Sequence, residues 1–331
     1  MQLGLGSMVA LAIAVALLAS MAIPPCCEAA GTVVKSIYVN QNGSADFKSI
    51  QDAVDSIPLG NSQWIRIHVA AGVYMEKVII PVYKSFILLE GEGRDQTSIE
   101  WADHAGGRYG TASSPTFASY ATDFMARRIT FKQNTYVRAG TMAPAVAALV
   151  AGDRSSFYGC GFVSVQDTLC DLAGRHYYEG CHVEGSMDFI FGQGQSIFQG
   201  CEIATARAPV SPGFITAQGR SSDADTSGFV FRDCTVGGVT PAYLGRAWRG
   251  YARVIFYRTA MSAVVVPLGW DAWDYKGREG SLMMVEAECT GPGSNRTGRV
   301  PWAKTMRDDE LAKFVDRSYV SADGWLDAQP R

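Results

Sequence analysis

A short phrase recurs along the chain at nearly constant spacing, and this repeat limits the fold more than any other feature. An aromatic residue is followed two and three positions later by glycine and cysteine in Phe157–Cys160, Tyr178–Cys181 and Phe198–Cys201, at steps of 21 and 20 residues, with a weaker copy in Phe231–Cys234. A period of about 20 residues, rich in aromatic and β-branched residues, is typical of a solenoid whose coils stack on one another. The repeat predicts an all-β fold, a single-stranded parallel β-helix.

Two aspartates share this period. Asp167 lies in the run Gln166–Leu169, Asp188 begins the run Asp188–Gly192, and the two are 21 residues apart. Strands of neighbouring coils lie about 4.8 Å apart, so residues one period apart sit above one another. We therefore expect Asp167 and Asp188 to face each other and to form one site.

Two facing carboxyl groups suit acid–base chemistry. When they lie within about 5 Å they cannot both ionise cheaply, so one stays protonated while its neighbour is an anion. The pair then supplies a general acid and a nucleophile or base. Arg246, in the run Leu244–Trp248, is the candidate that selects the charged member, and the side-chain amide of Gln166 is a candidate donor to an oxyanion.

Aromatic residues near these motifs are candidates for binding sugar rings. Trp248, Phe191 and Trp270 are expected to form an aromatic floor, although ordinary packing is the alternative for each of them.

Other kinds of function find little support in the sequence. The motifs of serine hydrolases, zinc proteases and P-loop enzymes do not occur, and His68, His104, His176 and His182 form no ligand pattern, so neither a metal nor a cofactor is expected. The 29 basic and 32 acidic residues give a net charge of −3 without long runs, which does not suggest a nucleic-acid surface.

The first residues have the pattern of a secretory signal. An uncharged apolar run, 8–23, precedes small residues, and cleavage after Ala29 would divide the chain into a signal peptide (1–29) and one domain (30–331). An uncleaved anchor helix is the alternative. Secretion would give meaning to the sequons at Asn42 and Asn295 and would place a soluble glycoprotein outside the cell. The six cysteines that remain could be stacked buried thiols or could include a Cys160–Cys181 disulfide.

The rest of the chain fits one solenoid domain. We expect a strand at 36–39, a helix at 47–54 that caps the open end of the solenoid, and a helix at 308–315 in a tail that packs back on it. The run 103–119, rich in Gly, Ser and Thr, is expected to be an exposed loop that helps to build a cleft.

These motifs resemble those of the plant pectin methylesterases (pectinesterases), in the short form without an inhibitor-like pro-domain. The resemblance also includes Ala71–Glu76 and Gly291–Ser294 and extends over nearly all of the chain after the signal. It implies a right-handed parallel β-helix that removes methyl groups from the C6 esters of galacturonate in cell-wall homogalacturonan.

The resemblance also implies a role for each site residue. Asp188 would attack the ester carbonyl, and Asp167 would protonate the leaving methanol and then activate water. Arg246 would keep Asp188 ionised, and Gln166 would help to bind the oxyanion. The family works without metal or cofactor, and it suggests a proteinaceous pectinesterase inhibitor as a partner; we expect a monomer.

Departures from the family pattern leave an alternative open. Pro144 stands where many members have a glutamine that donates to the oxyanion, and Cys170 replaces an aromatic residue. Ala247 also stands in place of a proline. The alternative function is a pectin-binding pseudoenzyme with weak or no turnover. A polygalacturonase or lyase on the same scaffold is a further rival, and it would cut the chain rather than release methanol.

Overall fold

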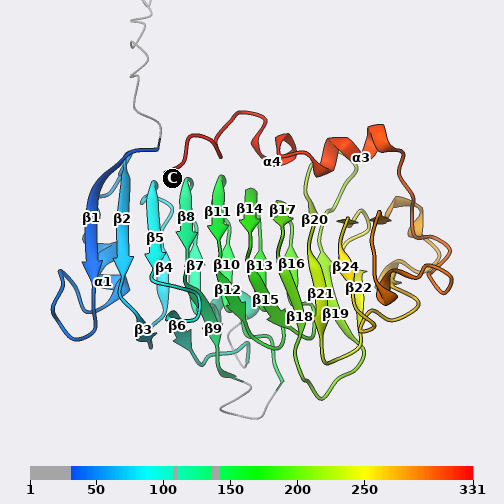
Figure 1. Cartoon of the computed structure of the whole chain (residues 1–331), viewed down its shortest axis with the longest axis horizontal. Coiled ribbons are helices and arrows are strands. Elements are labelled where there is room, and N and C mark those ends of the chain that lie inside the picture. Colours follow the sequence, from blue (N-terminus) through cyan, green and yellow to red (C-terminus); the bar gives the residue numbers. More distant parts are fainter. Residues whose placement is uncertain (1–30, 107–109, 136–141, 331) are drawn as a thin grey trace, which may run out of the picture. The chain divides into compact units, whose positions relative to one another are not determined.

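The fold is a solenoid of three parallel sheets, seen in the computed structural model, which describes residues 31–106, 110–135 and 142–330. Within these residues, sheet 1 is the ten-stranded sheet, sheet 2 is the eight-stranded sheet that ends in β25 (Trp270–Asp271), and sheet 3 is the eight-stranded sheet that ends in β24 (Ala260–Met261). Each coil passes through sheet 1, then sheet 3, then sheet 2, and returns to sheet 1 one strand further along (Figure 1). The strand pairs of all three sheets are parallel, for example β11 (Ser155–Tyr158) with β14 (Arg175–Glu179) and β13 (Leu169–Asp171) with β16 (Ile190–Gly192). The expected parallel β-helix is confirmed.

The strands are short, as the narrow coils require. Sheet 1 contains β1 (Val33–Val39), β2 (Trp64–Val69), β5 (Ile87–Gly91), β8 (Phe124–Arg127), β11 (Ser155–Tyr158), β14 (Arg175–Glu179), β17 (Gln195–Gln199), β20 (Gly228–Arg232), β23 (Arg253–Tyr257) and β26 (Met283–Ala287). Sheet 2 contains β4 (Val78–Ile80), β7 (Phe117–Ser119), β10 (Ala148–Val150), β13 (Leu169–Asp171), β16 (Ile190–Gly192), β19 (Gly213–Gln218), β22 (Ala242–Ala247) and β25 (Trp270–Asp271). Sheet 3 contains β3 (Gly72–Tyr74), β6 (Thr97–Trp101), β9 (Thr130–Gln133), β12 (Gly161–Val163), β15 (His182–Gly185), β18 (Glu202–Thr205), β21 (Thr235–Gly238) and β24 (Ala260–Met261).

The repeat phrase builds the interior of the solenoid. Its aromatic residues are register partners in sheet 1 and stack face to face: Phe157 on Tyr178 at 5.0 Å, and Tyr178 on Phe198 at 4.4 Å between ring centroids. Phe231 and Phe256 continue the stack. These five rings are fully buried, so the repeat exists because each coil must fill the same interior position.

In each copy of the phrase, the glycine and cysteine form the turn that follows a strand of sheet 1. Gly159, Gly180 and Gly200 have φ of 57°, 60° and 58°, a left-handed conformation that glycine adopts without strain. The buried thiol of Cys181 contacts the carbonyl oxygen of Phe157 at 3.4 Å, and equivalent contacts in later coils are made by Cys201, Cys234 and Cys289. All six cysteines of residues 31–330 are free, so the stacked-thiol interpretation is confirmed and the Cys160–Cys181 disulfide is not formed.

A helix closes the N-terminal end of the interior. Helix α1 (Ile50–Asp55) buries Ile50, Ala53 and Val54 against the first coil, which confirms the expected cap. It begins three residues later than expected, because Phe47 pairs with Val39 at the edge of β1. The Glu76 carboxylate accepts hydrogen bonds from the first backbone N–H groups of α1, which have no partner inside the helix.

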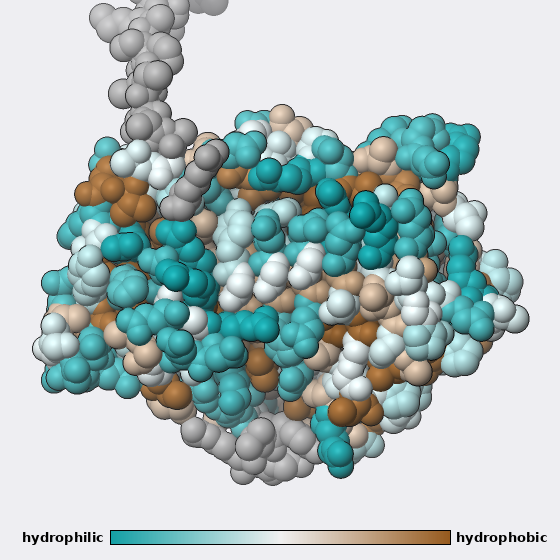
Figure 2. Space-filling model, viewed as in Figure 1, coloured by the Kyte–Doolittle hydropathy of each residue, from teal (hydrophilic) through white to brown (hydrophobic). Residues whose placement is uncertain are grey.

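A C-terminal tail covers the outer face of sheet 1. Helix α3 (Asp308–Val315) has the expected bounds, and α4 (Ser318–Ser321) follows it along the same face (Figure 1). Val320, Trp325 and Leu326 pack on outward-facing residues of sheet 1 such as Tyr177 and Ile197. In Figure 2, polar side chains cover most of the visible face, and apolar ones show between them.

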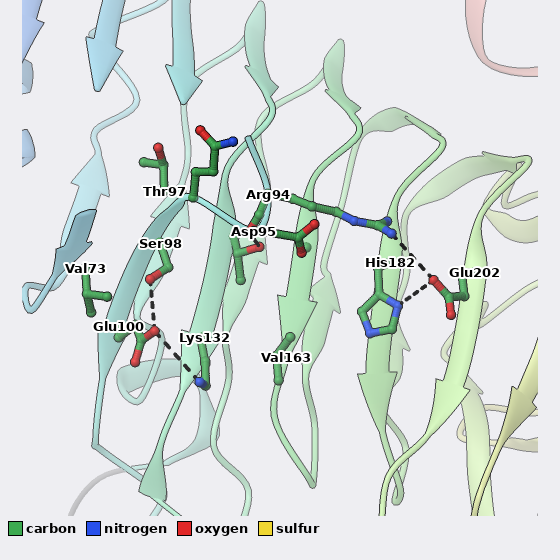
Figure 3. Close-up of a pocket in the computed structure, with 13 residues that line it drawn as sticks. Val73, Arg94, Asp95, Thr97, Ser98, Glu100, Lys132, Val163, His182 and Glu202 are labelled. Atoms are coloured by element: carbon green, nitrogen blue, oxygen red, sulfur yellow. Dashed lines mark hydrogen bonds and ion pairs between the residues drawn. The ribbon is translucent and has the colours of Figure 1, made fainter. Parts of the chain in front are cut away.

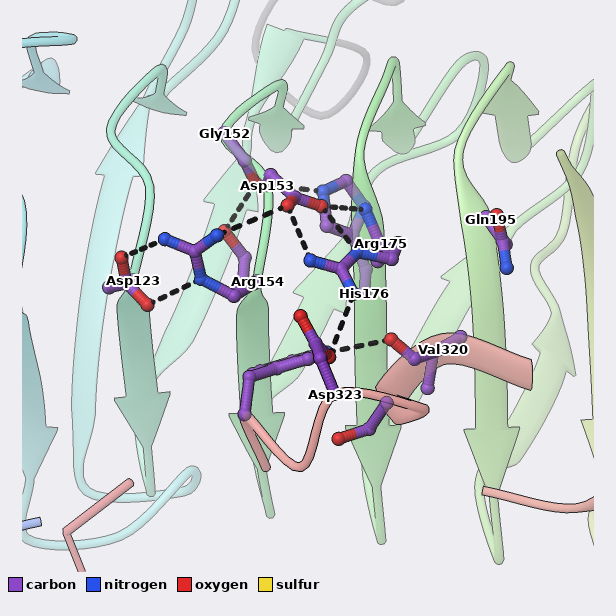
Figure 4. Close-up of polar contacts among 12 residues, drawn as sticks. Asp123, Gly152, Asp153, Arg154, Arg175, His176, Gln195, Val320 and Asp323 are labelled. Carbon is purple, nitrogen blue, oxygen red and sulfur yellow. Dashed lines mark hydrogen bonds and ion pairs between the residues drawn. The ribbon is translucent and has the colours of Figure 1, made fainter. Parts of the chain in front are cut away.

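Ionic contacts add to this packing. Arg175 of β14 donates to Asp153 of the preceding coil and to Asp323 of the tail, and Arg154 joins Asp153 to Asp123 (Figure 4). One residue of the tail, Asp323, thus joins through Arg175 a network of ion pairs that spans three neighbouring coils.

The expected loop at 103–119 is only partly a loop. It contains the short 3₁₀ helix η1 (Thr111–Ser113) and strand β7, whose residues are buried, while 107–109 lie outside the described residues. Further 3₁₀ turns are η2 (Trp273–Tyr275), η3 (Glu279–Ser281) and η4 (Pro292–Ser294). The expected signal peptide, 1–29, also lies outside the described residues. Among the helices of residues 31–330, none has the length and apolar character that crossing a membrane requires.

Candidate active site

Asp167 and Asp188 occupy the same corner of adjacent coils, just before strands of sheet 2. Gln166 pairs with Met187, Leu169 pairs with Ile190, and the Asp167 N–H donates to the Met187 carbonyl oxygen at 3.0 Å. Both aspartates adopt a left-handed backbone, with φ of 61° and 47°, which aspartate tolerates better than most side chains. The structure thus brings the two carboxyl groups together as the period indicates.

Arg246 reaches this pair from two coils further along. Across sheet 2, Phe191, Ala217 and Arg246 are successive register partners, so their side chains share the outer face. The Arg246 Nε donates to Asp188 Oδ1 at 2.7 Å, and its Nη2 donates to Asp188 Oδ2. A bidentate contact of this kind fixes the orientation of both partners. Among the described residues, Arg246 donates hydrogen bonds to Asp188 and to the sulfur of Met187, and none to Asp167.

Burial and charge act together on the two carboxyl groups. Burial, and then the nearby Asp188 carboxylate, raise the pKa of Asp167 to about 7, against an opposing effect of Arg246. Burial also raises the pKa of Asp188, although the hydrogen bonds and charge of Arg246 act to lower it. Arg246 lowers the pKa of both groups but donates hydrogen bonds to Asp188, so Asp188 is the member suited to carry the negative charge and Asp167 the proton.

A cleft of about 450 Å³ lies over the pair on the outer face of sheet 2. Its floor follows one register line across the strands: Leu149, Cys170, Phe191, Ala217 and Arg246. Burial raises the pKa of Cys170, so its thiol stays neutral in an apolar wall. Thr111 and Ala112 of η1 also line the cleft, which supports the expectation that the 103–119 segment helps to build it. The charged residues therefore sit beside an apolar surface.

Two of the three aromatic residues predicted for the floor line the cleft. Phe191 and Trp248 line the cleft with ring centroids 6.2 Å apart. The prediction for Trp270 was wrong: it is a register partner of Gly245, whose neighbour Arg246 points outward, so Trp270 points into the core. It is 1% exposed, and its indole N–H donates to Glu286. A tryptophan three residues later, Trp273, lines the cleft together with Trp248, although the sequence analysis did not single it out.

Gln166 lines the cleft beside Asp167, and its side-chain amide makes no hydrogen bond with any of the described residues. Pro144 has no N–H; its carbonyl oxygen accepts from the Ala105 N–H at 2.7 Å, and Val146, two residues on, lines the cleft.

A second groove, of about 440 Å³, runs over the outer face of sheet 3 (Figure 3). Its charges pair with one another: Arg94 and His182 both contact Glu202, and Lys132 contacts Glu100. Glu184 and then Glu202 raise the pKa of His182. Because Arg94, Lys132 and His182 each have a carboxylate partner, we interpret this groove as a solvated polar surface. Within residues 31–330 as described, no cluster of three His, Cys, Asp or Glu side chains could hold a metal ion.

The fold is thus a parallel β-helix that carries two facing carboxyl groups, an arginine and a largely apolar cleft on the outer face of sheet 2, and such an arrangement suits nucleophilic and acid–base chemistry. Comparison with known proteins agrees. The family model described as Pectinesterase matches residues 36–323. "Probable pectinesterase 29" of Arabidopsis thaliana is 44% identical over 309 residues, which cover 91% of each chain.

Solved structures agree as well. The pectin methylesterase from carrot superposes with a TM-score of 0.84 at 32% identity, covering 90% of this chain and 97% of that one. A pectin methylesterase in complex with a hexasaccharide superposes with a TM-score of 0.76 at 25% identity, covering 89% and 98%. The chain belongs to the pectinesterase family and is a carboxylic ester hydrolase.

Proposed function

We propose that the chain hydrolyses C6 methyl esters of homogalacturonan to carboxylate and methanol, with Asp188 as nucleophile and Asp167 as acid and base. The observation that carries the proposal is the pair of aspartates. Asp188 accepts hydrogen bonds from Arg246, and the pKa of Asp167 is raised to about 7. Membership of the family and the hexasaccharide complex of a relative support pectin as the substrate.

The reaction has two halves. An Asp188 oxygen attacks the ester carbonyl carbon, and the tetrahedral intermediate collapses as the C–O bond to methoxide breaks and Asp167 gives it a proton, which releases methanol. The product of this half is an acyl-enzyme on Asp188. Asp167, now an anion, takes a proton from water, and the hydroxide attacks the acyl carbon. The galacturonate carboxyl group leaves, Asp188 is restored as a carboxylate, and Asp167 is protonated again.

Other cleft residues have supporting roles in this proposal. The free amide of Gln166 donates to the oxyanion. Phe191 and Trp248 offer apolar faces on which sugar rings stack, and Arg246 serves both Asp188 and the anionic substrate. When one donor to the oxyanion is missing and nothing replaces it, the turnover of the enzyme falls by a factor of about 10² to 10³.

That loss is the basis of the second candidate function, a pectin-binding pseudoenzyme. Pro144 has neither a side-chain donor nor an N–H, so the donor that many relatives place there is absent. The cleft and its aromatic residues would then bind the polymer without efficient turnover.

Methanol release from highly methylated pectin tests both candidates. The parent protein should release methanol at constant polymer length, Asp188→Asn and Asp167→Asn should release almost none, and Asp223→Asn, at an exposed side chain, should match the parent. A folded parent that binds pectin but releases no methanol would favour the binding protein. A fall in polymer length would mean a polygalacturonase or lyase instead.

We also propose that the protein is secreted into the cell wall, soluble and monomeric, where a proteinaceous pectinesterase inhibitor is a partner. The apolar segment 8–23 and the two sequons support secretion. Edman sequencing of the secreted protein should begin at Ala30, and an intact Met1 would contradict the signal peptide.

A further inference from the structure

Arg246 contacts two aromatic rings in addition to Asp188. Its guanidinium carbon lies 3.6 Å from the centroid of the Trp273 ring and 4.4 Å from that of Phe214. Neither aromatic residue is needed for the chemistry described above. Both contacts are short for a cation over a ring, where attraction extends to about 6 Å. The side chain of Arg246 is 20% exposed, so water offers it little competition.

Each ring is held in place by contacts of its own. Trp273 has a left-handed backbone, with φ of 52°, which is uncommon for so large a residue. The Asp271 carboxylate stabilises this turn by accepting from the Trp273 N–H at 2.6 Å, and Asp271 is the register partner of Arg246. Phe214 stacks on Tyr243 at 5.0 Å with the ring planes 10° apart. A strained turn retained beside a cleft indicates that the position of its side chain matters.

We propose that Trp273 is a positioning residue, which with Phe214 holds the Arg246 guanidinium in the orientation that donates both hydrogen bonds to Asp188. This proposal rests on the ester hydrolysis proposed above. It adds that the aromatic residues around Arg246 help to keep Asp188 ionised. Planar stacking restricts rotation of the guanidinium, which its long side chain would otherwise allow.

The consequence is a pH effect with a definite sign. Arg246 acts to lower the pKa of Asp188, so a displaced guanidinium lets that pKa rise. The nucleophile must be ionised, and activity is lost as the pH falls through its pKa. Loss of Trp273 should therefore move the acidic limb of kcat/KM to higher pH. A move of about one pH unit lowers kcat/KM about tenfold at a pH on that limb.

Two tryptophan variants make a matched pair. Trp273→Leu should move the acidic limb to higher pH, and Trp273→Phe, which keeps a ring, should move it less. Trp248→Leu removes a tryptophan of the same cleft whose ring contacts Phe191 and not Arg246. This control should raise KM and leave the limb in place. If Trp273→Leu raises KM alone with the limb unchanged, Trp273 only contacts substrate and the proposal is wrong.

A second readout does not need turnover. The Arg246 Nε–Hε signal in a ¹H–¹⁵N spectrum should be shifted by the ring currents and protected from exchange in the parent. Trp273→Leu should remove much of that shift and protection, and Trp248→Leu should not. Unchanged Arg246 signals in a folded Trp273→Leu variant would overturn the positioning role. Absent methanol release with these spectral changes present would reject the hydrolysis and keep the positioning role.

Discussion

At the scale of single residues, the unequal environments of two chemically identical carboxyl groups decide what each can do. Asp188 receives the hydrogen bonds of Arg246, and Asp167 faces Asp188 from the neighbouring coil. The backbone places both at the same left-handed corner, and the contact that distinguishes them is the pair of hydrogen bonds that Arg246 donates to Asp188.

This asymmetry predicts the basic limb of the pH profile. Asp167 must be protonated to release methanol, and its pKa of about 7 means that the proton is lost as pH rises through that value. We expect kcat/KM for methanol release to fall above about pH 7. Initial rates at saturating and limiting pectin, measured from pH 4 to 9, would show it; a profile that rises steadily to pH 9 would contradict Asp167 as the acid.

The interior stack predicts a large effect on stability. Phe198 is fully buried between Tyr178 and Phe231, and Phe198→Ala would leave a cavity between coils. We expect the free energy of unfolding to fall by about 3 to 5 kcal/mol. Tyr83→Ala, at a residue that is 54% exposed, should change it by less than about 0.5 kcal/mol. Urea titrations of both variants give the comparison, and equal effects would mean that the stack is not a main source of stability.

Residues that repeat with the coil could be predicted, and residues that depend on a single turn could not. The period placed Asp167 and Asp188 together because strand pairing turns a sequence spacing into a distance. Trp270 was misplaced because neighbouring residues of a strand face opposite sides, and its register with Gly245 was not known from the sequence. Trp273 and Phe214 reach Arg246 through turns and long side chains that leave no periodic signal.

At the scale of elements, the tail and sheet 1 depend on each other. Sheet 1 has apolar residues on its outer face as well as its inner face, and the tail buries the outer ones. The sequence predicted helix α3 from its own pattern, yet not the ion pairs that attach the tail, because Arg175 and Asp323 are 148 residues apart.

Arg175→Met tests this attachment. The substitution keeps an unbranched apolar stem and removes the guanidinium contacts with Asp153 and Asp323, so we expect the tail to open more often and the free energy of unfolding to fall by about 1 kcal/mol. Limited proteolysis with chymotrypsin, followed by mass spectrometry, should show faster cleavage within the tail. Arg307→Met is the control, because Arg307 is 74% exposed and pairs only within the first turn of the tail. Equal cleavage rates for the two variants would show that the ion pairs do not attach the tail.

At the scale of the whole solenoid, the two sequons lie beyond opposite edges of sheet 1. Asn42 follows β1, in a loop whose Phe47 pairs with that edge strand, and Asn295 follows β26, shortly before Lys304 pairs with the other edge. Both asparagines are exposed, and each accepts a hydrogen bond from the backbone N–H of its own Ser or Thr, at 2.8 and 3.0 Å. Glycans there would hinder pairing between the ends of two molecules.

Secretion from a eukaryotic host should therefore yield protein with two glycans. Asn42→Gln and Asn295→Gln should each remove one, and the double variant should migrate like protein treated with an N-glycosidase. Intact mass spectrometry counts the glycans, and light scattering of the double variant should show more association than the parent. A parent without glycans would contradict both the modification and the secretory route.

The first and last described residues meet on the side of sheet 1. A Cβ placed on Gly31 would come within 2.5 Å of the Gln329 carbonyl oxygen, and Gln329 in turn accepts from Ser156 of β11. The cleft lies on sheet 2, so a tag fused at either end starts from the same spot and away from the reacting groups. The coils can therefore keep their neighbours even when the chain begins at a different residue. A circular permutant would join the two ends with a short linker and open the chain at an exposed turn, such as that of Asp223.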